Sequence, residues 1–128
     1  MKAIVCQAFG PVEDLSVQQI PEPAPGADEV LIDVASVGVN FPDALLVRGL
    51  YQVKPSLPFV PGIECAGTIA ALGKNVTTFT VGDRVAAMSP QFGTYAEAVV
   101  VPASHIYPIP EALDFDHAGA LLCRSEER

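Results

Sequence analysis

Short apolar runs separated by turn residues extend along most of the chain. Runs that alternate apolar and polar positions, or stay apolar for several residues, predict strands. The predicted strands cover residues 2–9, 15–20, 29–39, 65–72, 81–88 (a turn and then a strand), 93–101 and 105–109. Twelve prolines and ten glycines punctuate these runs, which is typical of closely spaced turns in a β-rich domain.

Two segments predict short helices instead. Residues 40–49 are compatible with a helix that Gly49 ends. Asp114 is a good N-cap for a second helix, in which Phe115 and Ala118 recur at helical spacing. The sequence therefore predicts a mainly β fold with short helices, in the form of a small, partly open β-barrel.

Size and charge narrow the range of functions. The 128 residues fit one domain, and the chain is half hydrophobic with a mean hydropathy of +0.37, so it can bury a core. The net charge is −8 and the pI is about 4.5. Phosphate backbones and anionic lipid would repel this charge. We therefore expect neither nucleic acid nor a membrane as a partner.

The cysteines and the N-terminus favour a reducing compartment. Cys6, Cys65 and Cys123 are widely spaced, and no Cys-x-x-Cys pair occurs. We interpret them as buried free thiols, without a disulfide framework or a structural zinc site. The apolar stretch at the N-terminus is too short for a signal peptide, and no segment approaches the length of a membrane span. A cytoplasmic protein is expected.

Several motifs, weak singly, become specific when taken in order. They are Gly-Val-Asn-Phe-Pro-Asp at 38–43, Pro-Gly-Ile-Glu-Cys-Ala-Gly at 61–67, Gly-Lys-Asn-Val at 73–76, Val-Gly-Asp-Arg-Val at 81–85, Gly-Thr-Tyr-Ala-Glu at 93–97 and Ile-Pro at 109–110. This series resembles the chaperonin-10-like (GroES-like) catalytic domain of the medium-chain dehydrogenase/reductase superfamily. The resemblance extends to about Cys123.

The zinc alcohol dehydrogenases of this superfamily carry a Cys and a His that ligate catalytic zinc. Asn40 and Ile63 stand at the corresponding places, and neither an isoleucine nor an amide replaces those ligands well. The four-cysteine lobe of that branch is also missing. His105 and His117 each stand alone, which favours surface or structural roles. We expect no zinc.

The zinc-free quinone oxidoreductases are a better match, because residues 38–51 are similar to that group's pattern. The resemblance implies that Asn40, Asp43 and Tyr51 lie around the nicotinamide of NADPH and the substrate cleft. Asn40 and Tyr51 would then orient a quinone or enone for hydride transfer. Asn40 and Asp43 are the expected cofactor contacts. Asp43 either fixes the start of the helix expected over residues 40–49, or lies beside the ribose of the nicotinamide.

Two further positions refine the resemblance. Leu45 stands where many relatives have an aromatic residue, and a leucine cannot donate a proton, so reduction of enoyl thioesters is disfavoured. Glu64 matches a glutamate that lies near the metal in zinc members. Without a metal it is equally compatible with a structural hydrogen-bonding role.

No Gly-x-Gly pair occurs in the chain, so the glycine-rich turn of a dinucleotide-binding domain is absent. We assign residues 1–123 to the GroES-like substrate domain and 124–128 to a polar tail, without a Rossmann domain. We therefore expect the chain alone to be inactive. Leu121 and Leu122 are expected to be exposed, which favours self-association, for instance as a homodimer.

Three other functions remain as alternatives. The first is a non-enzymatic, truncated binding or regulatory module that pairs with full-length relatives. The second is a co-chaperonin, which only the shared barrel favours and which the lack of a long glycine-rich mobile loop disfavours. The third is a zinc dehydrogenase domain, which one bound zinc would support.

Overall fold

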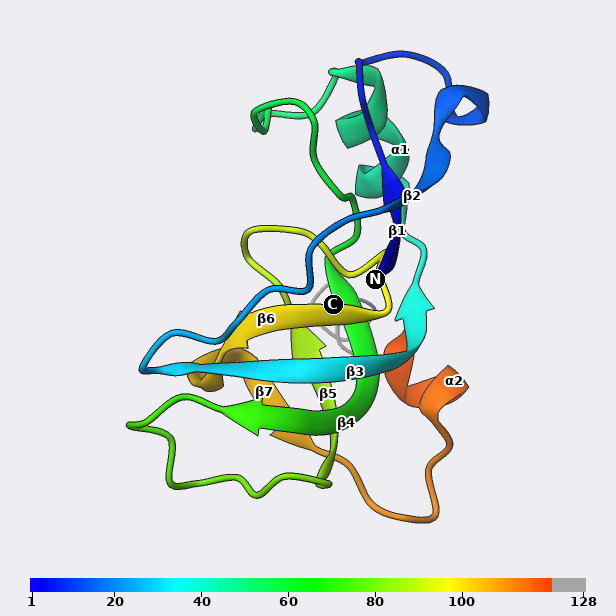
Figure 1. The fold of residues 1–128 in the computed structure, drawn as a ribbon. Helices are drawn as coiled ribbons and strands as arrows, with labels where there is room; N and C mark the ends of the chain where they lie inside the picture. Colours follow the sequence, from blue (N-terminus) through cyan, green and yellow to red (C-terminus); the bar gives the residue numbers. More distant parts are fainter. Residues whose placement is uncertain (121–128) are drawn as a thin grey trace.

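The computed structural model describes residues 1–120, and it confirms a mainly β fold with two short α-helices (Figure 1). The strands are β1 Lys2–Val5, β2 Ser16–Gln19, β3 Glu29–Gly38, β4 Glu64–Leu72, β5 Arg84–Met88, β6 Ala98–Pro102 and β7 Ile106–Pro108. The helices are α1 Phe41–Arg48 and α2 Phe115–Gly119, with 3-10 turns at Val12–Asp14 (η1) and Ala103–His105 (η2).

Five strands form one antiparallel sheet in the order β6-β3-β4-β5-β7. β3 and β4 are its long inner strands, and Figure 1 shows the sheet curling around them. The outermost strands, β6 and β7, do not pair with each other among the described residues. The sheet is thus a partly open barrel, as the sequence predicts.

The core lies inside the curl of this sheet. Its members are β-branched or small apolar residues, which pack well on a pleated surface. Those at most 1% exposed include Val30, Ile32, Ile69, Val85 and Val101. They come from β3, β4, β5 and β6, so burial of one shared cluster stabilises the strand order.

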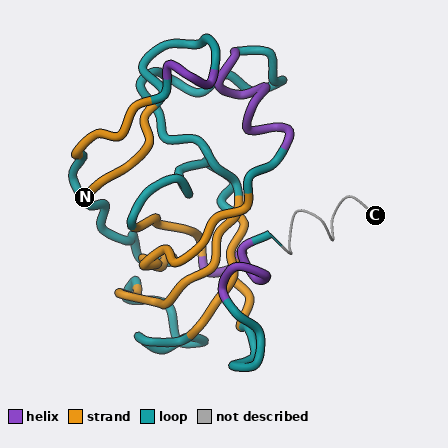
Figure 2. Tube along the Cα trace, turned by 90° about the vertical axis from the view of Figure 1, so that its right-hand side faces the viewer, coloured by secondary structure: helices purple, strands orange, loops and turns teal. Residues whose placement is uncertain are grey.

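A second, smaller group of elements lies at one end of the sheet. β1 and β2 pair as an antiparallel two-stranded sheet, and η1 and α1 lie beside them in the upper part of Figures 1 and 2. Leu46 and Val47 of α1 are buried, and the amide of Gly10 donates to the carbonyl of Val47 at 3.0 Å. Phe9 and Phe59 place their ring centroids 6.2 Å apart. The hydrogen bond from Gly10 ties α1 to the segment after β1, and the ring contact ties that segment to the chain before β4.

Most predicted strands agree with the structure to within a few residues, but two are much shorter at one end than the sequence indicates. The strand expected over residues 2–9 ends at Val5, although Cys6 still makes an isolated bridge with Phe59. The strand expected over 93–101 begins only at Ala98. Phe92 and Gly93 have a positive φ (66° and 103°) and turn the chain at the expected start, and the chain then bends at Tyr95 and Glu97, with only an isolated bridge from Ala96 to Ala3.

The pairing of β3 with β4 is irregular at two points, between Leu31 and Ile32 and between Val34 and Ser36. The register shifts between Val34 and Ser36, which indicates a β-bulge. Gly67 lies opposite this bulge, and a Cβ at Gly67 would collide with the backbone carbonyl oxygen of Asp33. Glycine is therefore required there for two backbones to come this close.

The predicted second helix is present as α2. Asp114 is its N-cap, and its carboxylate accepts from the backbone amide of His117 at 2.8 Å. Ala118 packs against Ala66 and Ala86 of the sheet. Leu121, Leu122, Cys123 and the predicted tail at 124–128 lie outside the described residues. No helix of the described part has the length and apolar character needed to cross a bilayer.

Candidate functional site

Several strand ends meet at the end of the sheet that faces α1. Gly38, the last residue of β3, pairs with Glu64, the first residue of β4. Glu64 in turn pairs with Met88, the last residue of β5. The antiparallel order therefore brings residues from three distant segments together immediately before α1.

Asn40 and Asp43 form the start of α1. Asn40 is the N-cap residue in extended conformation (φ −120°, ψ 158°), and the two side chains are arranged as a capping box. Asp43 Oδ2 accepts from the backbone N–H of Asn40 at 2.9 Å. Asp43 is only 4% exposed. Asp43 thus makes the hydrogen bond expected of a residue that fixes the start of a helix.

Tyr95 is the second donor to the same carboxylate. Its hydroxyl donates to Asp43 Oδ2 at 2.7 Å, across 52 positions of sequence. Burial, together with the hydrogen bond to Asp43 and its negative charge, raises the pKa of Tyr95 well above its usual range. The hydroxyl therefore stays protonated and remains a donor.

Glu64 lies directly against the end of β3. It is 1% exposed, and its Oε1 accepts from Asn40 Nδ2 at 2.9 Å. A Cβ at Gly38 would overlap the Glu64 carboxylate, so the glycine leaves the space that this side chain fills. Glu64 thus has the hydrogen-bonding role that the sequence offers as one alternative.

Tyr51 lies on a cavity beside this cluster. The cavity has a volume of about 360 Å³. It is lined by Tyr51, Val53, Ile63, Met88, Ser89, Pro90, Phe92 and His105. Most of these side chains are apolar, with the Tyr51 hydroxyl, Ser89 and the His105 imidazole as polar exceptions. Ile63 precedes Glu64 in the chain and Met88 pairs with Glu64 in the sheet, so the backbone of Glu64 neighbours this cavity. Asn40, Asp43 and Glu64 are not among the residues that line it.

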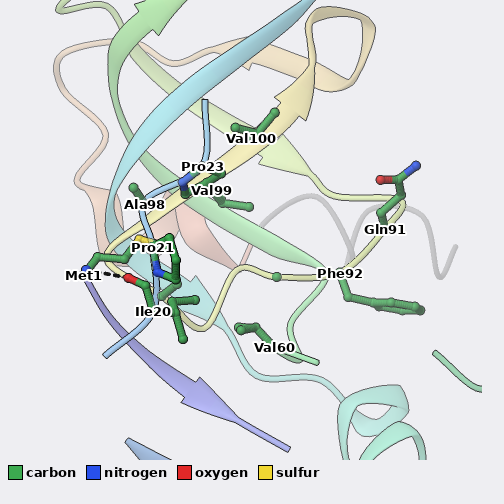
Figure 3. Close-up of a pocket in the computed structure, with 12 residues that line it drawn as sticks. Met1, Ile20, Pro21, Pro23, Val60, Gln91, Phe92, Ala98, Val99 and Val100 are labelled. Atoms are coloured by element: carbon green, nitrogen blue, oxygen red, sulfur yellow. Dashed lines mark hydrogen bonds between the residues drawn. The ribbon is translucent and has the colours of Figure 1, made fainter. Parts of the chain in front are cut away.

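A second cavity, of about 260 Å³, lies elsewhere on the sheet (Figure 3). The N-terminal amino group of Met1 donates to the carbonyl of Ile20 at 2.8 Å at its edge. Prolines and β6 valines form much of the rest of its lining. Phe92 borders both cavities, and Figure 3 shows its ring pointing away from Met1 and Ile20. None of the predicted site residues lies here.

The structure thus joins two of the three predicted site residues directly. Asn40 and Asp43 share hydrogen bonds, whereas Tyr51 lies on the adjoining cavity. Tyr95 joins these residues through Asp43 although the sequence does not mark it as a site residue; it lies in the Gly-Thr-Tyr-Ala-Glu motif. No local periodicity relates residues 43 and 95, so only membership of this motif could have indicated that Tyr95 belongs to the site.

The metal-binding side chains are scattered. Within residues 1–120, no group of three or more His, Cys, Asp or Glu side chains is placed to hold a metal ion. His117 Nδ1 lies 2.7 Å from Asp114 Oδ1 on the surface, and His105 Nδ1 lies 3.0 Å from Ser104 Oγ. Both histidines therefore have the surface or structural partners that the sequence favours.

Two cysteines are buried free thiols, as the sequence predicts. Cys6 and Cys65 are each 1% exposed. Burial raises the pKa of Cys6, and burial with the nearby charge of Glu64 raises that of Cys65 to about 12. Because the thiolate is the reactive form, we expect both to resist an aromatic disulfide reagent at pH 8 and to react on unfolding. Peptide mapping checks this, and rapid native labelling of Cys65 would contradict it.

Comparison with known proteins agrees with this architecture. Residues 26–111 match the alcohol dehydrogenase GroES-like domain family. The chain is 41% identical over 122 residues to the quinone oxidoreductase of Rattus norvegicus, covering 94% of this chain and 37% of that relative. It is 37% identical over 124 residues to the synaptic vesicle membrane protein VAT-1 homolog of the same species, covering 95% and 30%.

A solved structure shares the fold at similar coverage. The Escherichia coli quinone oxidoreductase complexed with NADPH matches with a TM-score of 0.89 and 29% identity, over 95% of this chain and 37% of that one. The chain belongs to the alcohol dehydrogenase GroES-like domain family. Its relatives confirm the predicted place in the quinone oxidoreductase branch of the medium-chain dehydrogenase/reductase superfamily. The chain spans about a third of the length of these relatives.

Proposed function

We propose that this domain forms the substrate side of an NADPH-dependent reductase of quinones or other conjugated carbonyl compounds. One observation carries the proposal: the amide of Asn40 is held at 2.9 Å by Glu64, whose chain neighbour Ile63 and strand partner Met88 line the same apolar cavity as Tyr51. A pocket that is mostly apolar with a few fixed polar groups suits a planar, uncharged substrate such as a quinone.

Asn40 and Tyr51 would act on the substrate carbonyl. The Asn40 amide nitrogen carries two hydrogens, and donation of one to Glu64 leaves the second for a ligand. The Tyr51 hydroxyl is a second donor on the cavity wall. NADPH, when bound, supplies a hydride, and negative charge then develops on the substrate oxygen. Donors fixed in advance stabilise such charge.

The relatives support this choice of substrate and cofactor. The similar rat protein is named quinone oxidoreductase, and the similar E. coli structure is a complex with NADPH. The donor set also fits a zinc-independent reaction. Asn40 uses its amide nitrogen as a donor to Glu64, and Ile63 has no lone pair to offer a metal.

We propose further that a separate domain binds most of the cofactor. Residues 1–120 join Asn40 to Asp43 at the start of α1, but the sequence has no Gly-x-Gly turn for a pyrophosphate. Asp43 therefore supports the nicotinamide side through Asn40. On this basis the 128 residues alone bind NADPH too weakly for turnover.

Titration calorimetry with NADPH tests the proposal. It is carried out on the 128-residue chain and on a version extended through the downstream reading frame, followed by quinone turnover assays on both. We expect binding and turnover only with the extended protein. Turnover by the 128 residues, abolished by Asn40→Ala, would refute the requirement for a second domain. If the extended protein binds NADPH but reduces no conjugated carbonyl compound, the proposed reductase activity is refuted.

A second candidate is a non-enzymatic module that pairs with a longer relative. Large apolar side chains are exposed around α1, at Val39 (79%), Phe41 (76%) and Leu50 (69%). An apolar group of this kind marks an interaction surface. If the extended reading frame adds no cofactor-binding domain and nothing binds NADPH, this candidate replaces the reductase. Self-association by the same surface would appear in sedimentation as a dimer.

A further inference from the structure

We propose that Tyr95 is a positioning residue, which fixes Asn40 through the carboxylate of Asp43. The inference rests on the proposed function, because it concerns the orientation of the group that would meet the substrate. Tyr95 itself touches neither Asn40 nor Tyr51 through any hydrogen bond of the described residues. Its effect is therefore transmitted through Asp43.

The geometry forms a continuous chain of hydrogen bonds. The Tyr95 hydroxyl donates to Asp43 Oδ2 at 2.7 Å, and the Asn40 backbone amide donates to the same oxygen at 2.9 Å. Asn40 Nδ2 then donates to Glu64 Oε1 at 2.9 Å. The backbone of Asn40 is thus held from one side and its side chain from the other.

The carboxylate depends strongly on these two donors. Asp43 is 4% exposed, and its other oxygen, Oδ1, is buried with no hydrogen-bond partner among the described residues. A buried carboxylate with few donors is costly unless those donors are kept in place. Loss of the Tyr95 hydroxyl would leave the Asn40 amide as the sole donor to Asp43 within this part of the chain.

Tyr95 belongs to a different part of the fold from its partner. It lies in the segment before β6, whereas Asp43 is in α1 and Glu64 begins β4. The Tyr95 backbone amide donates to the carbonyl of Pro61, and its carbonyl accepts from Ile4, at 3.1 and 2.8 Å. These bonds anchor the backbone of Tyr95 to the segment before β4 and to β1, so that its hydroxyl meets Asp43 from a fixed position.

Tyr95→Phe tests this proposal, because it removes only the hydroxyl. The first readout is the side-chain amide of Asn40 in ¹⁵N–¹H spectra of the 128-residue chain. We expect its two proton resonances to shift and to exchange faster with solvent than in the parent. Tyr107→Phe is the matched control, since Tyr107 is 46% exposed on β7, away from this cluster, and should leave the Asn40 signals unchanged.

The second readout is steady-state turnover in the extended, active protein. We expect Tyr95→Phe to lower kcat about tenfold through misplacement of Asn40, with the KM for NADPH unchanged. Unchanged Asn40 resonances in a folded Tyr95→Phe protein would overturn the positioning role, whatever the assay gives. Shifted resonances support it even if no protein reduces quinones, in which case the proposed function alone fails.

Discussion

Gly67→Ala is expected to destabilise the fold by about 3 kcal/mol, more than most single substitutions. The added methyl would collide with the backbone carbonyl of Asp33 at the bulge between β3 and β4. That carbonyl cannot move aside easily, because β3 is held between β4 and β6. Thermal unfolding followed by circular dichroism should show a Tm lower by roughly 10 °C.

Gly10→Ala is the matched control. A Cβ at Gly10 would lie 3.5 Å from Asp14 Oδ2, an ordinary contact, and Gly10 is not among the glycines with positive φ. Its stability should stay within about 0.5 kcal/mol of the parent. Equal Tm values for the two variants would show that β3 can shift at the bulge, and would contradict the close approach of the strands as a constraint.

Asn40→Ala is expected to lower kcat/KM for a quinone about 100-fold in the extended, active protein. The substitution removes the donor that Glu64 holds in place, and loss of one fixed donor to a developing oxyanion typically has an effect of this size. Stopped-flow measurement of NADPH oxidation gives the rate of the chemical step separately from product release.

Asn75→Ala provides the comparison for that experiment. Asn75 also donates its side-chain amide to a carboxylate, Asp28, at 3.1 Å, but both groups are exposed and belong to a surface turn. Its activity should match the parent. If Asn40→Ala retains full activity while folded, Asn40 does not meet the substrate and the proposed site is wrong.

The parts of the fold that the sequence predicts well are those set by neighbouring residues. The apolar alternation of residues 29–39 gave β3 to within one residue, and Gly49 ends α1 with φ 73° as expected. Asp114 likewise caps α2. In each case the deciding interaction lies within a few positions along the chain, where periodicity and capping preferences operate.

The site itself depends on contacts between distant segments. Asn40 and Asp43 could be proposed by family resemblance, but their hydrogen bonds to Glu64 and Tyr95 span 24 and 52 positions. The prediction of a strand from residue 93 also missed the turn at Phe92 and Gly93, which precedes Tyr95. Such pairings follow from strand order and bulges, which local patterns do not encode.

The strand order also has a consequence for how quickly the protein acquires its native form. β3 pairs with β6 about seventy positions later in the chain, and Ala3 bridges to Ala96. Proteins dominated by such remote pairings fold slowly, in milliseconds to seconds, because large loops must close first. Tyr95 is supplied by the last third of the chain. During synthesis, therefore, α1 can form early, but its N-cap residue Asn40 gains its final orientation only after the β6 segment has joined β3.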